Sequence, residues 1–450
     1  MIQMTLVQAA ALLGAQGITT NVEFTGLSTD SRTIETGNLF VAIPGARADG
    51  HDFLDDVQQK GAVAALVSRK MPSALPQLVV DDVVLALGKL ATHWRNQFHI
   101  PFIAATGSNG KTTLKNMIAS ILIAACHGRQ DQVLASQGTF NNHLGLPLTL
   151  AKLGLQHHYT VLEMGMNHFG EIEYLTNMAR PTVAVITNAA AAHLEGVGDL
   201  AGVARAKAEI FLGLAQDGAA ILNRDDQFYP YWCNQIGNRK HISFGLHENA
   251  DVSAILLDAD ITQRITLRTP QGNTAVNLPL LGIHNVLNAL AAAAATLAIG
   301  IDLNAIKMGL EKMTPAPGRL QMHTLANGVN IIDDTYNANP FSLQAAVKTL
   351  AGFEGKKILV LGDMKELGSD TQLLHKTAGE NIKQAGIDYL FTYGELSANT
   401  SQAFGEGAYH FSEQEKLVSA LKPFLYNTTT ILIKGSRSMK MEKVVAGLMA

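Results

Sequence analysis

The feature that most constrains the fold is a glycine-rich loop between an apolar run and a helical pattern. The run PFIAAT occupies residues 101–106, the loop TGSNGKTT covers 106–113, and the pattern LKNMIASILIA follows. A strand, a tight loop and a helix in this order direct backbone N–H groups and a helix N-terminus at one point. The segment therefore predicts a parallel-sheet unit that binds a nucleotide triphosphate.

The side chains of the loop support this interpretation. Lys111 has the reach for the β- and γ-phosphates, and the Thr112 hydroxyl is a ligand for Mg²⁺. Gly107 and Gly110 let the backbone approach oxygen atoms that a Cβ would block. Ala105 stands at the first glycine position of the usual pattern. The alternative is a turn that merely contains Gly and Lys, but the correct flanks on both sides favour the nucleotide site. The predicted contacts to ATP are Thr106, Gly107, Ser108, Asn109, Gly110, Lys111, Thr112 and Thr113.

Strand-like and helix-like patterns alternate along the rest of the chain, which predicts an α/β protein. At roughly 150 residues per domain, the length of 450 residues suggests three domains. We expect a small N-terminal α/β domain over 1–98, a central P-loop-type domain with a mostly parallel sheet over 99–314, and a Rossmann-like domain over 315–450. The segment MTPAPG at 313–318 marks the second boundary, and its part from 315 to 318 is a candidate hinge.

Composition excludes several classes of protein. The net charge of −4 argues against a dedicated nucleic-acid binder, and the two cysteines argue against a disulfide scaffold. The first residues have no basic region and predict a helix that begins after Thr5 and ends before Gly14. The charge-free run 269–301 contains Asn, Pro and His, so we do not expect it to span a membrane. The sequence therefore predicts a cytoplasmic protein without membrane insertion, and we expect a monomer.

Two residues beyond strand ends are candidates for holding the metal ions that polyphosphate chemistry needs. Glu163 lies in VLEMG and His193 follows PTVAVITN, and the carboxyl ends of parallel strands share one edge of the sheet. A lone Glu is usually solvated and a lone His is usually structural, so their shared position leaves both interpretations open. Lys207, in AKAEIF, would by composition alone be a surface lysine.

An ordered set of motifs resembles the muramyl ligases, the ATP-dependent amide ligases that build the peptidoglycan stem peptide. The motifs are TGSNGKTT, GTFNNHLGLPLT, LEMGMNHFGEI, ITNAAAAHLEGVG with AKAEIF, GIHNVLNALAA, PGRLQ and DDTYNANP. The segments STDSR, GNLFVAIPGARADGHDF and LGDMKELG point to the type that joins D-alanyl-D-alanine to UDP-N-acetylmuramoyl-tripeptide. The resemblance implies an acyl-phosphate intermediate and the products ADP, phosphate and UDP-MurNAc-pentapeptide.

The resemblance also implies the metal chemistry. It implies two Mg²⁺ ions held by Thr112, Glu163, His193 and Lys207, with Lys207 carbamylated. A carbamate turns a cation into an anionic oxygen ligand, which reverses the electrostatic role of the lysine. Catalytic roles are implied for Lys111, Lys207 and His193.

Further contacts are implied for the nucleotide and the other substrates. Asn285 and Asn288 match ATP contacts, and Arg319 and Asp334 match contacts to phosphate and ribose. Ordinary alternatives exist, since STDSR is also a typical turn and loop asparagines often satisfy backbone groups. The implied substrate contacts are Ser28, Asp30, Ser31, Arg32, Asn141, Asn142, His143, Tyr336, Asn337, Asn339, Lys434 and Arg437.

Three alternatives fit the sequence less well. A muramyl ligase that adds a single amino acid is expected to carry a DNPR signature, which is absent here. Folylpolyglutamate synthases share the phosphate loop but are not expected to share STDSR. A catalytically inactive nucleotide-binding scaffold would not require Lys111, Glu163, His193 and Lys207 together.

Overall fold

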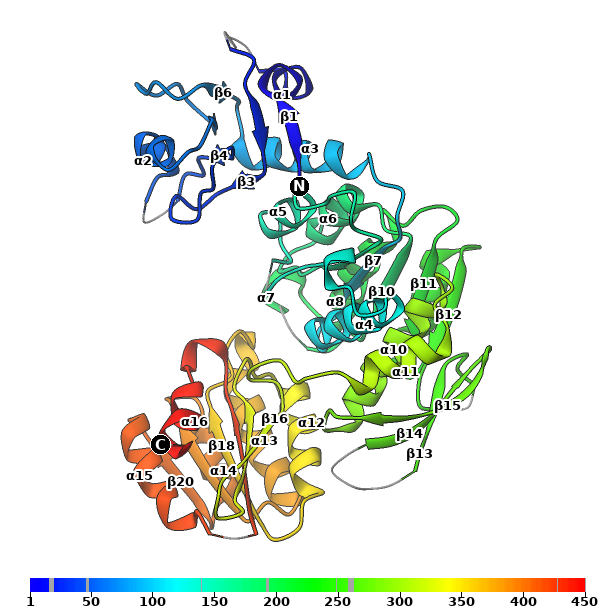
Figure 1. Ribbon diagram of the computed structural model, residues 1–450. Coiled ribbons are helices and arrows are strands. Elements are labelled where there is room, and N and C mark those ends of the chain that lie inside the picture. The colour runs from blue at the N-terminus through cyan, green and yellow to red at the C-terminus, as the bar shows by residue number, and fades with distance from the viewer. Residues whose placement is uncertain are drawn as a thin grey trace.

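The structure is a computed structural model that describes residues 1–15, 20–45, 48–138, 140–191, 194–247, 249–257, 263–426 and 428–449 (Figure 1). Three successive parts of the chain form separate sheets. In Figure 1 the N-terminal part lies at the top, the central part below it, and the C-terminal part at the lower left. The mixed α/β class with a mostly parallel central sheet is confirmed. The boundaries at 98 and 314 stay predictions.

The N-terminal part pairs a small antiparallel sheet with a four-stranded parallel sheet. Its strands are β1 (Gln3–Thr5), β2 (Glu23–Thr25), β3 (Leu27–Ser28), β4 (Leu39–Val41), β5 (Ala64–Val67) and β6 (Gln77–Val79). Its helices are α1 (Leu6–Leu13), α2 (Leu54–Gln59) and α3 (Val83–Arg95). Thr5 caps α1 by accepting from the Gln8 N–H, and Gly14 follows the helix at φ 71°. Both predicted ends of this helix are confirmed.

The central part contains a six-stranded parallel sheet in the order β12-β11-β10-β7-β9-β8. The strands are β7 (Phe102–Thr106), β8 (Val133–Ala135), β9 (Tyr159–Glu163), β10 (Val183–Ile186), β11 (Ala219–Asn223) and β12 (Lys240–Phe244). The helices are α4 (Lys111–Ala125), α5 (Gly145–Leu150), α6 (Glu171–Ala179), α7 (Leu194–Val197), α8 (Leu200–Ala208) and α9 (Tyr229–Ile236). Because all these strands run parallel, the loops after β7, β9 and β10 open at one edge.

A three-stranded antiparallel sheet and two helices complete the central part. The strands are β13 (Ser253–Leu256), β14 (Gln263–Thr269) and β15 (Gly272–Leu278), and the helices are α10 (Ile283–Leu297) and α11 (Leu303–Glu311). The charge-free run 269–301 thus divides into β15 and α10. The alanines of α10 from 289 to 295 are fully buried, which lets this helix pack closely against the central core. Within the described ranges, no helix is long and apolar enough to cross a membrane.

The C-terminal part is a six-stranded sheet in the order β16-β17-β21-β18-β19-β20, with β16 as its antiparallel edge. The strands are β16 (Gln321–Thr324), β17 (Asn330–Asp334), β18 (Lys356–Gly362), β19 (Tyr389–Tyr393), β20 (Ala408–Phe411) and β21 (Thr429–Lys434). The helices are α12 (Pro340–Ala351), α13 (Thr371–Gln384), α14 (Ala398–Phe404), α15 (Gln414–Leu421) and α16 (Glu442–Met449). The neighbours β17 and β21 end in register, so Asp334 lies beside Lys434.

Candidate functional site

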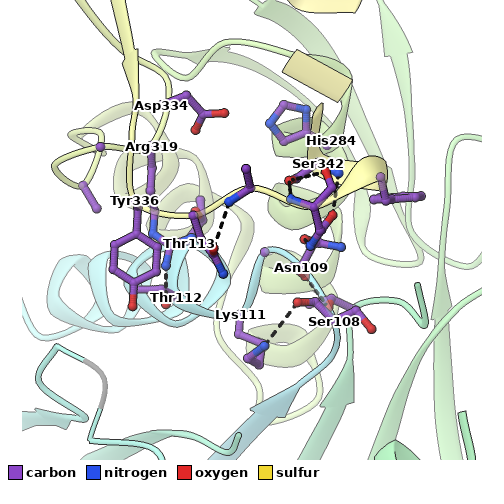
Figure 2. A pocket seen from close by; sticks show the side chains of 18 of the residues that line it. Ser108, Asn109, Lys111, Thr112, Thr113, His284, Arg319, Asp334, Tyr336 and Ser342 are labelled. Atoms are coloured by element: carbon purple, nitrogen blue, oxygen red, sulfur yellow. Dashed lines mark hydrogen bonds between the residues drawn. The ribbon is translucent and has the colours of Figure 1, made fainter. Parts of the chain in front are cut away.

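A pocket of about 910 Å³ lies where the carboxyl edge of the central sheet meets the C-terminal part (Figure 2). Sequence-predicted residues from both parts line it. They are Ser108, Asn109, Gly110, Lys111, Thr112, Thr113, Asn141, Asn142, Glu163, Asn285, Asn288, Arg319, Asp334, Tyr336, Asn337, Asn339, Lys434 and Arg437. The structure therefore brings together residues that are more than 300 positions apart in the chain.

The glycine loop follows β7 and leads into α4, as predicted. Gly107 lies at φ 146° and Gly110 at φ 83°, a region of backbone conformation that side chains rarely adopt. A Cβ on Gly107 would collide with Thr187, and one on Gly110 would lie 2.5 Å from Asn288 Oδ1. Both positions therefore need glycine for conformation and for space.

Lys111, the first residue of α4, extends back over its own loop. Its ammonium donates to Gly107 O at 2.6 Å and to Ser108 O at 3.3 Å. Burial lowers the pKa of Lys111, and the nearby Glu163 carboxylate opposes that shift. The ammonium thus already lies in the loop where the terminal phosphates of a nucleotide would bind.

Two residues that directly follow β10 form hydrogen bonds to the glycine loop. Asn188 Oδ1 accepts from the Asn109 N–H at 3.0 Å, and Thr187 Oγ1 donates to Asn109 O at 2.7 Å. Sequence analysis did not predict these two residues as part of the site. The signal was present, because a Thr-Asn pair directly follows the buried strand VAVI.

Glu163 ends β9 beside the loop, in register with Ala105 of β7, and is 2% exposed. Its Oε1 accepts from Asn141 Nδ2 at 2.9 Å. Its Oε2 is buried and has no hydrogen-bond partner within the described part of the chain. A buried carboxylate oxygen without a donor fits a cation, and the Thr112 hydroxyl lines the same pocket.

The other predicted metal residues differ in how well they are placed. His193 lies outside the described residues, and among those that are described no group of three His, Cys, Asp or Glu forms a metal cluster. Lys207, in α8, is fully buried, and its Nζ has no hydrogen-bond partner among the described residues. Burial first, and then the field of Lys111, lower the pKa of Lys207 well below its usual value. The alternative that Lys207 is a surface lysine is wrong.

The start of α10 forms a second wall of the pocket. Asn285 Nδ2 donates to Leu281 O at 2.7 Å, and Asn288 Nδ2 donates to Asn285 Oδ1 at 3.2 Å. His284, which sequence analysis did not select, lines the pocket with a buried Nδ1 that has no partner in the described ranges. Burial, with Lys434 as a second cause, lowers the pKa of His284 to about 4, so the ring is neutral at pH 7.

The C-terminal part reaches the glycine loop through two side chains. Arg319 Nη2 donates to Thr112 Oγ1 at 3.1 Å, and Asn339 Nδ2 donates to Asn109 Oδ1 at 3.0 Å. The Arg319 guanidinium also lies 4.0 Å from the centre of the Tyr336 ring. Figure 2 shows Arg319 and Tyr336 side by side above Thr112. These contacts complete the nucleotide pocket from the other side of the interface.

Asp334 and Lys434 form a largely buried ion pair in the lining of the pocket. Lys434 Nζ donates to Asp334 Oδ2 at 2.6 Å and to Asn337 O at 2.9 Å. Burial raises the pKa of Asp334, although Lys434 opposes that shift. Arg437, on the rim, pairs with Glu442 at 3.3 Å and is largely exposed. The two basic residues thus differ, since Lys434 holds a neighbouring carboxylate while Arg437 faces solvent.

Several predicted residues do not line the pocket. Ser28 ends β3 in the N-terminal part, and Asp30, Ser31 and Arg32 follow that strand, where Arg32 forms a two-point pair with Asp30. Thr106, Gly107, His143 and Lys207 are also absent from the lining. Asn142 lines the pocket, and its Oδ1 also accepts from the Leu144 and Gly145 N–H groups at the start of α5.

Family models match three consecutive parts of the chain. The Mur ligase family catalytic domain matches residues 23–95, the Mur ligase middle domain 105–296, and the Mur ligase glutamate ligase domain 318–437. These matches extend over all three parts of the fold.

Individual proteins are similar over the full length. A UDP-N-acetylmuramoyl-tripeptide–D-alanyl-D-alanine ligase of Escherichia coli (strain K12) is 44% identical, with 100% of this chain and 99% of that protein covered. The enzyme of the same name from Bacillus subtilis (strain 168) is 37% identical over 94% of this chain and 93% of its own. A crystal structure of MurF from Acinetobacter baumannii superposes with a TM-score of 0.91 at 36% identity, covering 100% and 99% of the two chains. MurF ligase from Thermotoga maritima in complex with ADP superposes with a TM-score of 0.84 at 27% identity, covering 94% and 97%.

Proposed function

Because the chain belongs to the Mur ligase family, we propose that it joins D-alanyl-D-alanine to UDP-N-acetylmuramoyl-tripeptide at the expense of ATP, in peptidoglycan synthesis. The products are ADP, phosphate and UDP-MurNAc-pentapeptide. The observation that carries this proposal is one pocket in which Arg319 and Asn339 of the C-terminal part contact Thr112 and Asn109 of the glycine loop. Such a pocket lets the two parts of the chain hold a phosphoryl donor and a second substrate next to each other.

The chemistry sets what the pocket must do. A carboxylate is a poor electrophile, so an oxygen of the tripeptide carboxylate first attacks the γ-phosphorus of ATP, and ADP leaves. The free amine of the dipeptide then attacks the acyl carbon, and phosphate leaves as the amide forms. The protein has to bring anions together, neutralise their charge and exclude water from the acyl phosphate.

Residue roles follow from this requirement as proposals. Lys111 and the loop N–H groups neutralise the β- and γ-phosphates, and Arg319 approaches from the opposite wall. Asn288 and Asn285 bind the nucleoside end, and Asp334 binds the ribose. Asn141 orients Glu163 through the hydrogen bond to its Oε1. Lys434, Arg437, Tyr336, Asn337 and Asn339 face the acceptor side.

Magnesium fits the same wall. We propose Thr112, Glu163, His193 and a carbamylated Lys207 as the residues that hold it, and the Glu163 oxygen without a donor supports this set. When bound, Mg²⁺ supplies positive charge that stabilises the oxygens of the transferred phosphoryl group. Glu163 contributes the anionic ligand, and Thr112 contributes a neutral hydroxyl at the start of α4.

Carbamylation of Lys207 is chemically reasonable at this position. Burial lowers the pKa of Lys207 well below its usual value, which favours the neutral amine with its free electron pair. That pair attacks the carbon of CO₂, and one proton leaves, so the amine becomes an anionic carbamate. The buried Nζ without a partner in the described part of the chain is the observation that supports this modification.

The remaining proposals concern the uridine diphosphate contacts, the loop between β8 and α5, and the domain ranges. We propose that Ser28, Asp30, Ser31 and Arg32 bind the uridine diphosphate, for which Arg32 must exchange its pair with Asp30 for phosphate. Asn142 and His143 lie next to Asn141 in the loop that leads from β8 to α5. The domain ranges 1–98, 99–314 and 315–450, with a hinge at 315–318, are part of the same proposal.

A phosphate-release assay tests the function. We expect release that depends on both UDP-N-acetylmuramoyl-tripeptide and D-alanyl-D-alanine, with the pentapeptide product detected by mass. Release with neither acceptor would favour a simple ATPase, and binding of nucleotide without turnover would favour a scaffold. Activity with a single amino acid in place of the dipeptide would favour a different muramyl ligase.

A further inference from the structure

Lys115 is a buried cation that the roles above leave unexplained. It lies in α4 one helical turn after Lys111, so both side chains leave the same side of the helix. Only 4% of Lys115 is exposed. Within the described ranges its ammonium makes no hydrogen bond and has no carboxylate within 4.0 Å. Buried lysines are rare unless they are paired.

The surroundings of Lys115 indicate which charge it is placed to meet. Glu163 is the one group that favours its charged form, while burial and the field of Arg319 oppose it. Glu163 itself has a buried Oε2 without a donor among the described residues. Glu163 therefore lies near enough to act on the charge of Lys115, but within the described ranges no hydrogen bond or ion pair joins the two side chains.

A buried lysine without a partner does not stabilise the fold. Burial of an unpaired ammonium costs free energy, and an apolar side chain of similar volume would be more favourable for the fold. Lys111 on the loop and Arg319 from the opposite wall already bring two positive charges to the pocket, so a third one adds to their repulsion. A polyanion bound in the pocket would balance these three cations around one carboxylate.

We propose that Lys115 is a positioning residue for phosphoryl transfer, whose buried charge is matched only when a polyphosphate fills the pocket beside Glu163. This inference rests on the proposed function. Lys115 does not line the pocket, so it acts through the electric field rather than by direct contact with substrate. In this arrangement the unpaired charge of Lys115 lowers the stability of the unliganded protein, and nucleotide binding offsets that loss.

The test replaces Lys115 by methionine, which keeps the side-chain length and removes the charge. The probe is the non-hydrolysable analogue AMP-PNP with Mg²⁺, measured by calorimetry. We expect its Kd to rise about tenfold or more in Lys115→Met, as for loss of an interaction with a charged group. The KM for ATP should rise likewise with a smaller change in kcat, because the charge favours bound nucleotide before and during reaction.

A second readout separates this role from a structural one. The unfolding temperature of unliganded Lys115→Met should equal or exceed that of the wild type, because an unpaired buried charge has been removed. A structural lysine would show the reverse, with a lower unfolding temperature and an unchanged Kd. Lys115→Gln gives a second variant if the first does not fold, and Lys89→Met, at an exposed position on α3, is the matched control.

The inference is overturned if the folded Lys115 variants bind Mg·AMP-PNP within about twofold of the wild type. Failure of the proposed function looks different. In that case the wild-type protein itself would not bind Mg·AMP-PNP, or would bind it without acceptor-dependent phosphate release, and this inference would fall with it.

Discussion

Replacement of Gly110 by alanine should weaken nucleotide binding through a contact that the structure specifies. Gly110 lies at φ 83°, where an alanine costs about 1–2 kcal/mol. Its Cβ would lie 2.5 Å from Asn288 Oδ1, so the Asn288 side chain has to move. That movement breaks the 3.2 Å hydrogen bond to Asn285, worth about 1 kcal/mol.

These costs apply to nucleotide binding as well as to folding. In the Gly110→Ala variant the loop can relax away from Asn288. Nucleotide binding then has to restore the original loop conformation, and the free energy of that change reduces the binding free energy. A total of about 2–3 kcal/mol corresponds to a Kd that rises roughly 30- to 150-fold. Calorimetric titration with Mg·AMP-PNP measures this change directly.

Gly128→Ala is the matched control. Gly128 lies after α4 at φ 88°, and a Cβ added there would meet no described atom within 4 Å. This variant carries the same backbone cost without the contact to Asn288, so its Kd should equal that of the wild type. A Gly110→Ala protein that binds nucleotide as well as Gly128→Ala would refute the role of the loop.

Three further predictions concern single side chains. Lys207→Ala should fold but lose most ligase activity, with partial recovery by small added carboxylates; unchanged turnover would contradict the proposed carbamate. Arg319→Ala should raise the KM for ATP about tenfold to a hundredfold, because a charged contact to the loop is lost, and an unchanged KM would argue against it. His284 has a folded pKa of about 4 against 6.5 unfolded, so its contribution to stability is present above about pH 6.5 and is lost as pH falls toward 4. Between pH 7 and pH 5 this loss is about 2 kcal/mol, and denaturant unfolding should show it in the wild type but not in His284→Gln.

Features that depend on local sequence were predictable. The strand, loop and helix around Lys111 follow from consecutive residues, and so do the cap at Thr5 and the end of α1 at Gly14. Glu163 was also placed correctly at the loop, because the carboxyl ends of parallel strands meet at one edge. In each case the physical cause lies within a few residues or within one rule of sheet topology.

Features that depend on which strands become neighbours were not predictable. Asp334 and Lys434 are 100 positions apart and pair because β17 lies beside β21, an order that the sequence does not state. The sheet of β13–β15 was missed, although alternating polar and apolar residues flank a Thr-Pro-Gln-Gly turn at 269–272. His284 and Lys115 are ordinary in sequence. A buried Nδ1 without a partner in the described ranges marks His284, and the burial of its side chain marks Lys115.

The central claim is that the terminal phosphoryl group of ATP passes to the carboxylate of the tripeptide. Turnover of UDP-N-acetylmuramoyl-tripeptide labelled with oxygen-18 in its terminal carboxylate tests this most directly. If an acyl phosphate forms, the released phosphate carries one oxygen-18 atom from the carboxylate, and the new amide retains the other. Phosphate released without the label, together with pentapeptide formation, would contradict the account.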